Sequence, residues 1–156
     1  MGKKIIFVSC LVLALIITTG CGGSKNDDKE FTCSRTMEPT DGVKIDMNYD
    51  VKYTDDYVDE VVFTEKITSD DEEILEIYKD SMDELYSVYS DLEYYDATSE
   101  VSGNTLTTTV TINYAKIDTD KLIELDPTNA TLIKNGKVSV EDYKAMYKQV
   151  GAECTK

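Results

Sequence analysis

The sequence predicts an α+β fold: an antiparallel β-sheet built from hairpins, one long helix packed on its apolar face, and a C-terminal helix. Three observations predict this arrangement. Apolar and polar residues alternate over residues 43–53, apolar residues recur at helical spacing over residues 70–92, and alternation returns over residues 95–114. A period of two is typical of a strand with one wet face, whereas a period near 3.6 is typical of a helix with one buried side.

The first hairpin is predicted from two neighbouring segments that each place apolar side chains on one face. Residues 43–53 alternate strictly, and residues 57–67 form the next strand. A three-residue loop over residues 54–56 pairs Met47 with Phe63, which keeps both apolar faces on the same side of the sheet, whereas a two-residue loop does not. We therefore expect one face of this hairpin to lie against the core.

Further strands are predicted on both sides of this hairpin. Residues 31–37 form a shorter strand upstream, and a Pro-Thr-Asp-Gly turn sequence follows it. Residues 95–114 form a second hairpin downstream. Its two-residue Gly103-Asn104 turn pairs Val101 with Leu106, so that the apolar faces of its two strands agree.

A long helix is predicted between the two hairpins. The segment Ser69-Asp70-Asp71-Glu72 has the form of a capping box, with acidic residues in the first turn, where the helix dipole favours them. About six turns follow, with one apolar stripe that we expect to face the sheet. This stripe consists of Ile74, Ile77, Tyr78, Met82, Leu85, Tyr89 and Leu92.

The C-terminal part is predicted to be helical in two places. A short helix spans residues 119–125 and ends at Asp126-Pro127. An irregular segment with an Asn135-Gly136 turn follows. The last helix begins after Ser139, its N-cap, and ends at Gly151, which stands where a C-terminal cap belongs.

Residues 1–20 have the features of an export signal. Lysines occupy residues 3–4, an apolar run spans residues 5–17, and small residues follow. The thirteen residues of the run make a helix of roughly 20 Å, which is shorter than the ~30 Å hydrocarbon core of a bilayer. We therefore predict that this segment is cleaved rather than kept as a membrane span.

The end of this segment, Thr18-Thr19-Gly20-Cys21, resembles the lipobox of bacterial lipoproteins, with Thr18 in place of the usual Leu. The resemblance implies cleavage between Gly20 and Cys21 and lipidation of Cys21. Two or more acyl chains make such anchoring stable, since each buried methylene contributes about 0.8 kcal/mol. The alternative is an ordinary secretory signal that contains a cysteine near its cleavage site.

The predicted organisation has three parts. Residues 1–20 are the lipoprotein signal peptide, residues 21–30 are a lipidated flexible tether, and residues 31–156 are a single α+β extracytoplasmic domain. The membrane is an expected partner, through the lipid on Cys21. The expected location is the extracytoplasmic face of the cell membrane.

Two of the four cysteines remain for the folded domain. Cys10 leaves with the signal and Cys21 carries lipid, so Cys33 and Cys154 stand near the two ends of the domain. Domain termini often lie close together, and an exported chain meets oxidising conditions, so we predict a disulfide between Cys33 and Cys154. Two unpaired thiols are the alternative. A redox-active pair is disfavoured because the spacing is not that of a CxxC motif.

The charge of the chain excludes several functions. The 16 Lys and Arg residues and 31 Asp and Glu residues give a net charge of −15, and the chain contains no His. A surface this acidic repels the phosphate backbone of nucleic acids. Without His, catalytic triads and metal sites that use imidazole are impossible. Most carboxylates lie in solvated runs such as residues 70–73. We therefore expect no nucleic-acid partner, no cofactor and no enzymatic activity.

Two other groups of residues are candidates for binding sites. Acidic residues cluster at 55–60 and 118–120, but neither cluster has the spacing of a twelve-residue calcium loop, so we expect weak cation binding and no dedicated metal site. Most of the eleven tyrosines fall on core-facing positions. Tyr86, Tyr94 and Tyr147 do not, and exposed rings of this kind would suit a glycan or a peptide.

Four segments carry a resemblance to a known family: the lipobox ending at Cys21, the strand and turn of residues 49–58, residues 114–118 ahead of the short helix, and residues 151–154. In these segments the chain resembles the YehR-like group of small bacterial lipoproteins and its relatives in low-GC Gram-positive bacteria. The resemblance implies an α+β fold with an antiparallel sheet. It implies no activity and therefore assigns no catalytic residue.

The sequence thus predicts a non-enzymatic, membrane-anchored lipoprotein that presents its domain to a partner protein. The alternative is a carrier of a small ligand or cation, which needs a pocket between the long helix and the sheet. An enzyme ranks third. An exposed apolar patch would favour protein interaction, an internal cavity would favour the carrier, and two convergent buried carboxylates would favour an enzyme.

Overall fold

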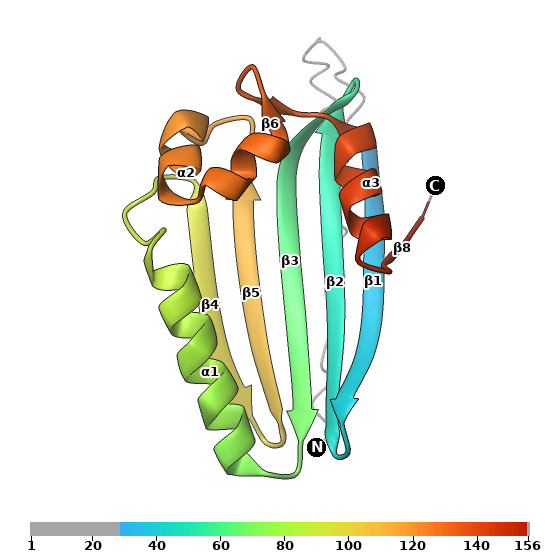
Figure 1. The fold of residues 1–156 in the computed structure, drawn as a ribbon, viewed down its shortest axis with the longest axis vertical. Helices are drawn as coiled ribbons and strands as arrows, with labels where there is room; N and C mark the ends of the chain where they lie inside the picture. The colour runs from blue at the N-terminus through green and yellow to red at the C-terminus, as the bar shows by residue number, and fades with distance from the viewer. Residues whose placement is uncertain (1–28, 156) are drawn as a thin grey trace, which may run out of the picture.

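The fold is an antiparallel sheet with helices on one of its faces, as the computed structural model of the chain shows for residues 29–155 (Figure 1). The sheet has six strands in the order β4-β5-β3-β2-β1-β8. These strands are β1 (Lys29–Thr40), β2 (Val43–Thr54), β3 (Tyr57–Ser69), β4 (Tyr95–Ser102), β5 (Thr105–Asn113) and β8 (Glu153–Cys154). The predicted α+β class is confirmed.

The helices cover different parts of this face. Figure 1 shows α1 beside β4 and β5, α3 over β1 and β2, and α2 at one end of the sheet. The bounds of these and the remaining elements are α1 (Glu72–Ser87), α2 (Thr119–Leu125), the 3₁₀ helix η1 (Pro127–Thr131), α3 (Val140–Gln149) and the two-stranded hairpin of β6 (Ile133–Lys134) and β7 (Lys137–Val138).

The first hairpin turns differently from the prediction. Its loop has two residues, Asp55 and Asp56, and Asp55 adopts a left-handed conformation with φ 55°. The register then shifts between Lys52 and Tyr53, which leaves Asp59 as a β-bulge in β3. A bulge adds one residue to one strand, as a third loop residue would. The apolar faces of the two strands therefore stay on the same side, as predicted.

The cross-strand partners in this hairpin are displaced by two residues from those predicted. Phe63 lies opposite Tyr49 rather than Met47, and Met47 lies opposite Glu65. The first strand is also longer than residues 31–37, because β1 begins at Lys29 and pairs along the whole of β2. Alternation fixes which face each side chain occupies, but it does not distinguish registers that differ by two residues.

The second hairpin and the C-terminal elements match their predictions. Val101 lies opposite Leu106 across the two-residue turn. The bounds of α2 are those expected, and Asn135-Gly136 joins β6 to β7. Ser139 caps α3 by accepting a hydrogen bond from the Asp142 amide at 3.0 Å, and Gly151, with φ 84°, follows the end of the helix.

The long helix is shorter than predicted and begins at a different cap. Asp71, not Ser69, is the N-cap of α1, and its carboxylate accepts a hydrogen bond from the Glu73 amide at 3.0 Å. Ser69 instead accepts one from the Asp71 amide at 3.1 Å. The helix ends at Ser87, whose hydroxyl donates to the Glu84 carbonyl. Hydrogen bonds of this kind, from a side chain to a nearby backbone carbonyl, compete with the backbone hydrogen bonds of a helix. The chain continues after Ser87 in a series of turns.

The side of α1 that faces the sheet also differs from the predicted stripe. Leu75, which lies outside that stripe, is 1% exposed and packs with Ile67 and Leu106. By contrast, Ile77 and Leu85 point into solvent. The apolar residues of this segment extend over more than one side of a helix, so packing against the sheet selects which of them are buried.

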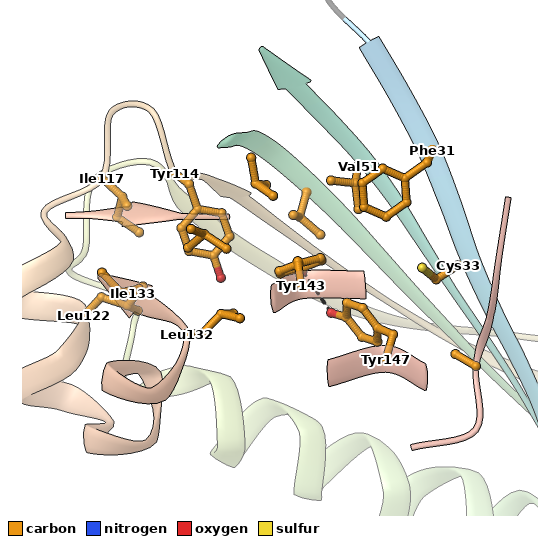
Figure 2. Close-up of a cluster of buried hydrophobic side chains, with 14 of the residues drawn as sticks. Phe31, Cys33, Val51, Tyr114, Ile117, Leu122, Leu132, Ile133, Tyr143 and Tyr147 are labelled. Atoms are coloured by element: carbon orange, nitrogen blue, oxygen red, sulfur yellow. Dashed lines mark hydrogen bonds between the residues drawn. The ribbon is translucent and has the colours of Figure 1, made fainter. Parts of the chain in front are cut away.

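Two clusters of buried apolar side chains hold the helices on the sheet. The larger joins α2 and α3 to the sheet, and Figure 2 shows Phe31 and Val51 of the strands facing Tyr143 and Tyr147 of α3. The hydroxyls of these two tyrosines lie 2.9 Å apart. Tyr147, which was predicted outside the core, is therefore buried. The smaller cluster lies beneath α1 and consists of Val43, Ile45, Ile67, Leu75 and Leu106.

Replacing Leu75 by Ala is expected to lower the free energy of unfolding by about 2–5 kcal/mol, because the change leaves a cavity beneath α1. Ile77→Ala on the same helix is the matched control, and it should change this free energy by less than about 0.5 kcal/mol because the side chain is in solvent. Urea unfolding followed by circular dichroism measures both. Equal losses would mean that α1 turns another side to the sheet.

Candidate functional site

The predicted processing site and lipidation site lie outside the described residues. This holds for Gly20 and Cys21, for the signal peptide of residues 1–20 and for residues 21–28 of the tether. The last two tether residues, 29–30, begin strand β1. Within residues 29–155, no helix is both long enough and apolar enough to cross a membrane.

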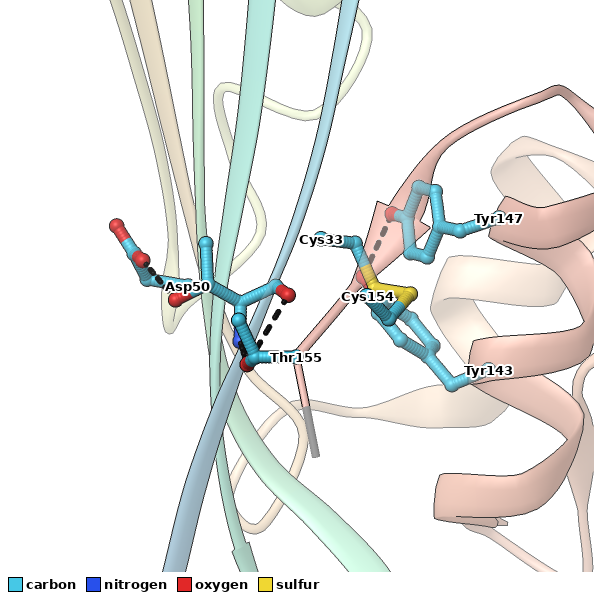
Figure 3. The surroundings of a disulfide bond; sticks show 7 residues. Cys33, Asp50, Tyr143, Tyr147, Cys154 and Thr155 are labelled. Carbon is cyan, nitrogen blue, oxygen red and sulfur yellow. Dashed lines mark hydrogen bonds between the residues drawn. A yellow bond between two sulfur atoms is a disulfide. The ribbon is translucent and has the colours of Figure 1, made fainter.

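A disulfide joins Cys33 of β1 to Cys154 of β8, which confirms the predicted pairing (Figure 3). The two residues lie opposite each other in the sheet, with Cα atoms 3.9 Å apart and 121 positions of sequence between them. Backbone bonds continue the pairing, since the Thr155 amide donates to the Thr32 carbonyl at 2.8 Å. The bond thus fastens the chain after α3 to the edge of the sheet.

A row of polar side chains crosses the helix-covered face of the sheet between the two apolar clusters. The register places one residue of each long strand in this row, each beside its neighbour on the next strand. We call it the polar row, and it consists of Arg35, Met47, Glu65, Thr108 and Ser99. Only Met47 among them is apolar. The Ser99 and Thr108 hydroxyls lie 3.2 Å apart and are hydrogen-bonded.

Glu65 is the one acidic side chain that is buried among the residues the structure describes, with an exposed fraction of 5%. Burial raises the pKa of its carboxyl group. Two tyrosine hydroxyls are affected by this carboxylate, Tyr49 of β2 and Tyr86 of α1. Burial, together with the nearby Glu65 charge, raises the pKa of each hydroxyl to about 12. A buried carboxylate of this kind is a candidate functional group.

A pocket of about 250 Å³ opens between α1 and β4 and reaches the polar row at Ser99. Tyr86 of α1 lines the pocket, and the charge of Glu65 contributes to the raised pKa of its hydroxyl. Asp83 and Asp96 add negative charge to the lining. Asp83 pairs with Lys79, whose hydrogen bond holds the pKa of the Asp83 carboxyl below its usual value. The position matches the pocket that a small-ligand carrier needs.

The outward side of α1 and of the turn that follows it carries large apolar side chains. Ile77, Leu85 and Val88 are 59%, 55% and 54% exposed, and we call these three residues the outer face of α1. Exposed acidic residues adjoin them, since Asp80 lies one turn from Ile77 and Glu84 one turn from Val88. Leu85 and Val88 lie one turn apart, and Ile77 lies about two turns before Leu85. Large apolar side chains exposed along one helix are a candidate interaction surface.

The other sequence candidates do not come together into a site. No group of three or more potential metal ligands is formed by the part of the chain that the structure describes. In the cluster at residues 55–60, Asp59 accepts a hydrogen bond from Thr54 at 2.6 Å and Glu60 pairs with Lys52 at 2.8 Å. Of the three tyrosines predicted outside the core, Tyr94 is exposed, Tyr86 is half-buried and Tyr147 is buried.

Sequence reasoning missed two features of the structure, the burial of Glu65 and the exposure of Ile77. Glu65 alternates in phase with Val61, Phe63 and Ile67, so the period of β3 was a sufficient signal that its side chain faces the core. The exposure of Ile77 had no such signal, because helical spacing does not state which apolar side of a helix is covered.

The fold and these sites define a small, disulfide-closed α+β domain. No protein-family model matches the chain, and no curated protein matches it. Among solved structures, the NMR structure of a protein from Streptococcus pneumoniae TIGR4 is similar, with 18% identity and a TM-score of 0.53 over 99% of this chain and 98% of that chain. The NMR structure of the E. coli YehR protein is similar with 17% identity and a TM-score of 0.56 over 83% of this chain and 94% of that chain. The likeness shows a YehR-like fold, as the sequence suggested, and it carries no activity to this chain.

Removing the disulfide is expected to lower the free energy of unfolding by about 4–5 kcal/mol in the chain-entropy treatment, because the bond closes a loop that spans most of the domain. The double variant Cys33→Ser/Cys154→Ser and the reduced parent should lose similar amounts. Urea unfolding with and without reductant measures the change. A reductant effect on the double variant would point to another source of the loss.

Replacing Glu65 by Gln is expected to stabilise the domain at pH 8 but not at pH 4. The pKa of Glu65 is higher in the folded state than in the unfolded chain, so the protonated side chain favours folding. This contribution to stability is fully present below the ordinary Glu pKa of about 4.3. It is lost as the pH rises through the raised pKa of the folded state. Gln stays neutral throughout. The expected gain at pH 8 is about 1–3 kcal/mol, the cost of an unpaired buried group.

Urea midpoints of the parent and of Glu65→Gln at the two pH values test this. Glu100→Gln, which removes an exposed carboxylate from β4, is the matched control. The difference between its urea midpoint and that of the parent should be nearly the same at both pH values. A difference between parent and Glu65→Gln that is the same at both pH values would contradict the expected ionisation.

Proposed function

We propose that this chain is a membrane-anchored extracytoplasmic lipoprotein whose domain binds a partner protein through the outer face of α1. Its anchoring is supported by the lipobox-like segment that ends at Cys21, after an apolar run of signal-peptide length. The disulfide between Cys33 and Cys154 agrees with this location, because disulfides persist in oxidising compartments outside the cytoplasm.

The single observation that carries the binding role is the exposure of Ile77, Leu85 and Val88. Each leaves more than half of a large apolar side chain in water, although the same segment supplies the apolar contacts of α1 with the sheet. Covering such surface is favourable by about 25 cal/mol per Å² of apolar area. A protein partner provides that cover without disturbing the inner side of the helix.

The charge around the outer face indicates the chemistry of the partner. Asp80 and Glu84 stand next to the apolar side chains, and Glu76 is exposed on the same helix. Without residues 1–20 the chain has 14 basic and 31 acidic residues, a net charge of −17. A second copy of the chain or an anionic membrane would therefore be repelled. The surface fits a partner segment that combines apolar side chains with Lys or Arg.

In-cell crosslinking of the anchored protein tests this function. The double variant Ile77→Ser/Leu85→Ser is expected to lose specific crosslinked neighbours by at least tenfold, since both side chains are in solvent and the fold does not need them. The matched control is Val150→Ser, which removes an apolar side chain of 49% exposure after α3 and should keep the crosslinks.

Anchoring is checked in the same cells. Cys21→Ser is expected to release the protein from the membrane fraction, and intact-mass measurement of the parent should show a chain that begins at Cys21 and carries acyl groups. Equal crosslinking of the Ile77→Ser/Leu85→Ser variant and the parent would overturn the role of the outer face. An unmodified parent chain that begins at Met1 would overturn the anchoring.

A further inference from the structure

We propose that an extended segment of a partner protein adds to the free edge of β4 as a further, antiparallel strand of the sheet. The segment carries basic side chains on one face and small apolar side chains on the other. Binding here does not require the outer face of α1, since none of the three residues of that face lines the pocket beside β4. It is a second contact, beyond the one proposed above.

The free edge of β4 offers unpaired backbone groups. Among the described strands β4 pairs with β5 alone. The Asn113 amide of β5 donates to the Tyr94 carbonyl at 3.1 Å, and in an antiparallel pair every second residue from there on bonds to β5. The residues between them, Ala97, Ser99 and Val101, direct their amides and carbonyls to the edge. No hydrogen bond within the described part of the chain uses these groups.

The edge of β4 is regular, whereas the opposite edge of the sheet is not. β4 pairs with β5 along all 8 of its residues without a bulge, and it contains no Pro. At the opposite edge β8 covers part of β1, and the register of β1 shifts between Met37 and Thr40, around Pro39. Bulges, Pro and covering segments are features that block pairing at sheet edges. Strand addition is therefore favoured at β4.

The pocket of about 250 Å³ between α1 and β4 supplies space beside this edge. Ala97 and Ser99 line it from the strand, and Met82 and Tyr86 line it from the helix. A residue of an added strand lies opposite its β4 neighbour with its side chain on the same face. The side chains of the added strand that face α1 therefore contact this lining, and small apolar side chains such as Val suit it.

The charge on the other face of β4 favours a basic segment. Asp96 and Glu100 are exposed there, and neither belongs to an ion pair formed within the described residues. An added strand places every second side chain beside these carboxylates, where Lys or Arg is favourable. Pairing with β4 of a second copy would bring like charges together instead, which is unfavourable. Main-chain bonds give such a complex its affinity, and the alternating side chains give it specificity.

The test is binding of the purified full chain to a short peptide with blocked ends in which Lys and Val alternate, followed by NMR hydrogen exchange. The amides of Ala97, Ser99 and Val101 are expected to exchange at least about tenfold more slowly when the peptide is bound, because each then donates to a peptide carbonyl. The same peptide with Glu in place of Lys should bind at least about tenfold more weakly. Failure of the Lys/Val peptide to bind, or binding without this protection, would overturn the proposal.

N-methylated peptides test the hydrogen bonds directly. In an antiparallel addition the Val residues lie opposite Ala97, Ser99 and Val101 and turn their amides toward β4, whereas the Lys amides point into solvent. Methylation of the Val amides is expected to abolish binding. Methylation of the Lys amides should change the affinity by less than about threefold. Equal affinities of the two methylated peptides would contradict strand addition.

Two charge variants locate the edge that binds. Glu100→Lys reverses a charge on β4 and should lower the affinity for the Lys/Val peptide at least about tenfold. Glu153→Lys makes the same change on β8, at the opposite edge of the sheet, and should bind within about twofold of the parent. The reverse order would assign the peptide to the other edge and refute the role of β4. The Ile77→Ser/Leu85→Ser variant should bind the peptide as the parent does, so this result is separate from failure of the outer face of α1.

Discussion

The structure depends on one constraint: a sheet with a single apolar face must have that face covered. Apolar and polar side chains alternate along the strands apart from the bulge at Asp59, and helices from two parts of the chain pack on the same side of the sheet. α1 covers the smaller apolar cluster, and α2 and α3 cover the larger. The polar row crosses the face between these clusters, and Glu65 stands in that row because its position is in phase with the apolar residues of β3.

The disulfide completes this cover at one edge of the sheet. β8 has only two residues and β6 and β7 form a separate small sheet, so hydrogen bonds alone hold little of the C-terminal segment to β1. The bond between Cys33 and Cys154 fixes the chain after α3, and thereby keeps Tyr143 and Tyr147 against the sheet. Covalent closure and burial of the larger cluster thus support each other.

The proposed function involves the outward side of α1. The outward residues Ile77 and Leu85 form the proposed contact with a partner, and Tyr86 lines the pocket between α1 and β4. A helix with acidic residues around apolar ones suits such a partner, because its negative field attracts a basic protein segment.

The sequence by itself determined the fold class, the faces of the strands, the second hairpin, α2, the cap of α3 and the pairing of Cys33 with Cys154. These follow from local periodicity, from turn and cap chemistry and from cysteine counting. Tertiary structure decided the bulge at Asp59, the side of α1 that is covered and the isolation of Glu65. The physical reason is that period-two alternation is blind to a shift of two residues, and a helix that is apolar on two sides is oriented only by the surface on which it packs.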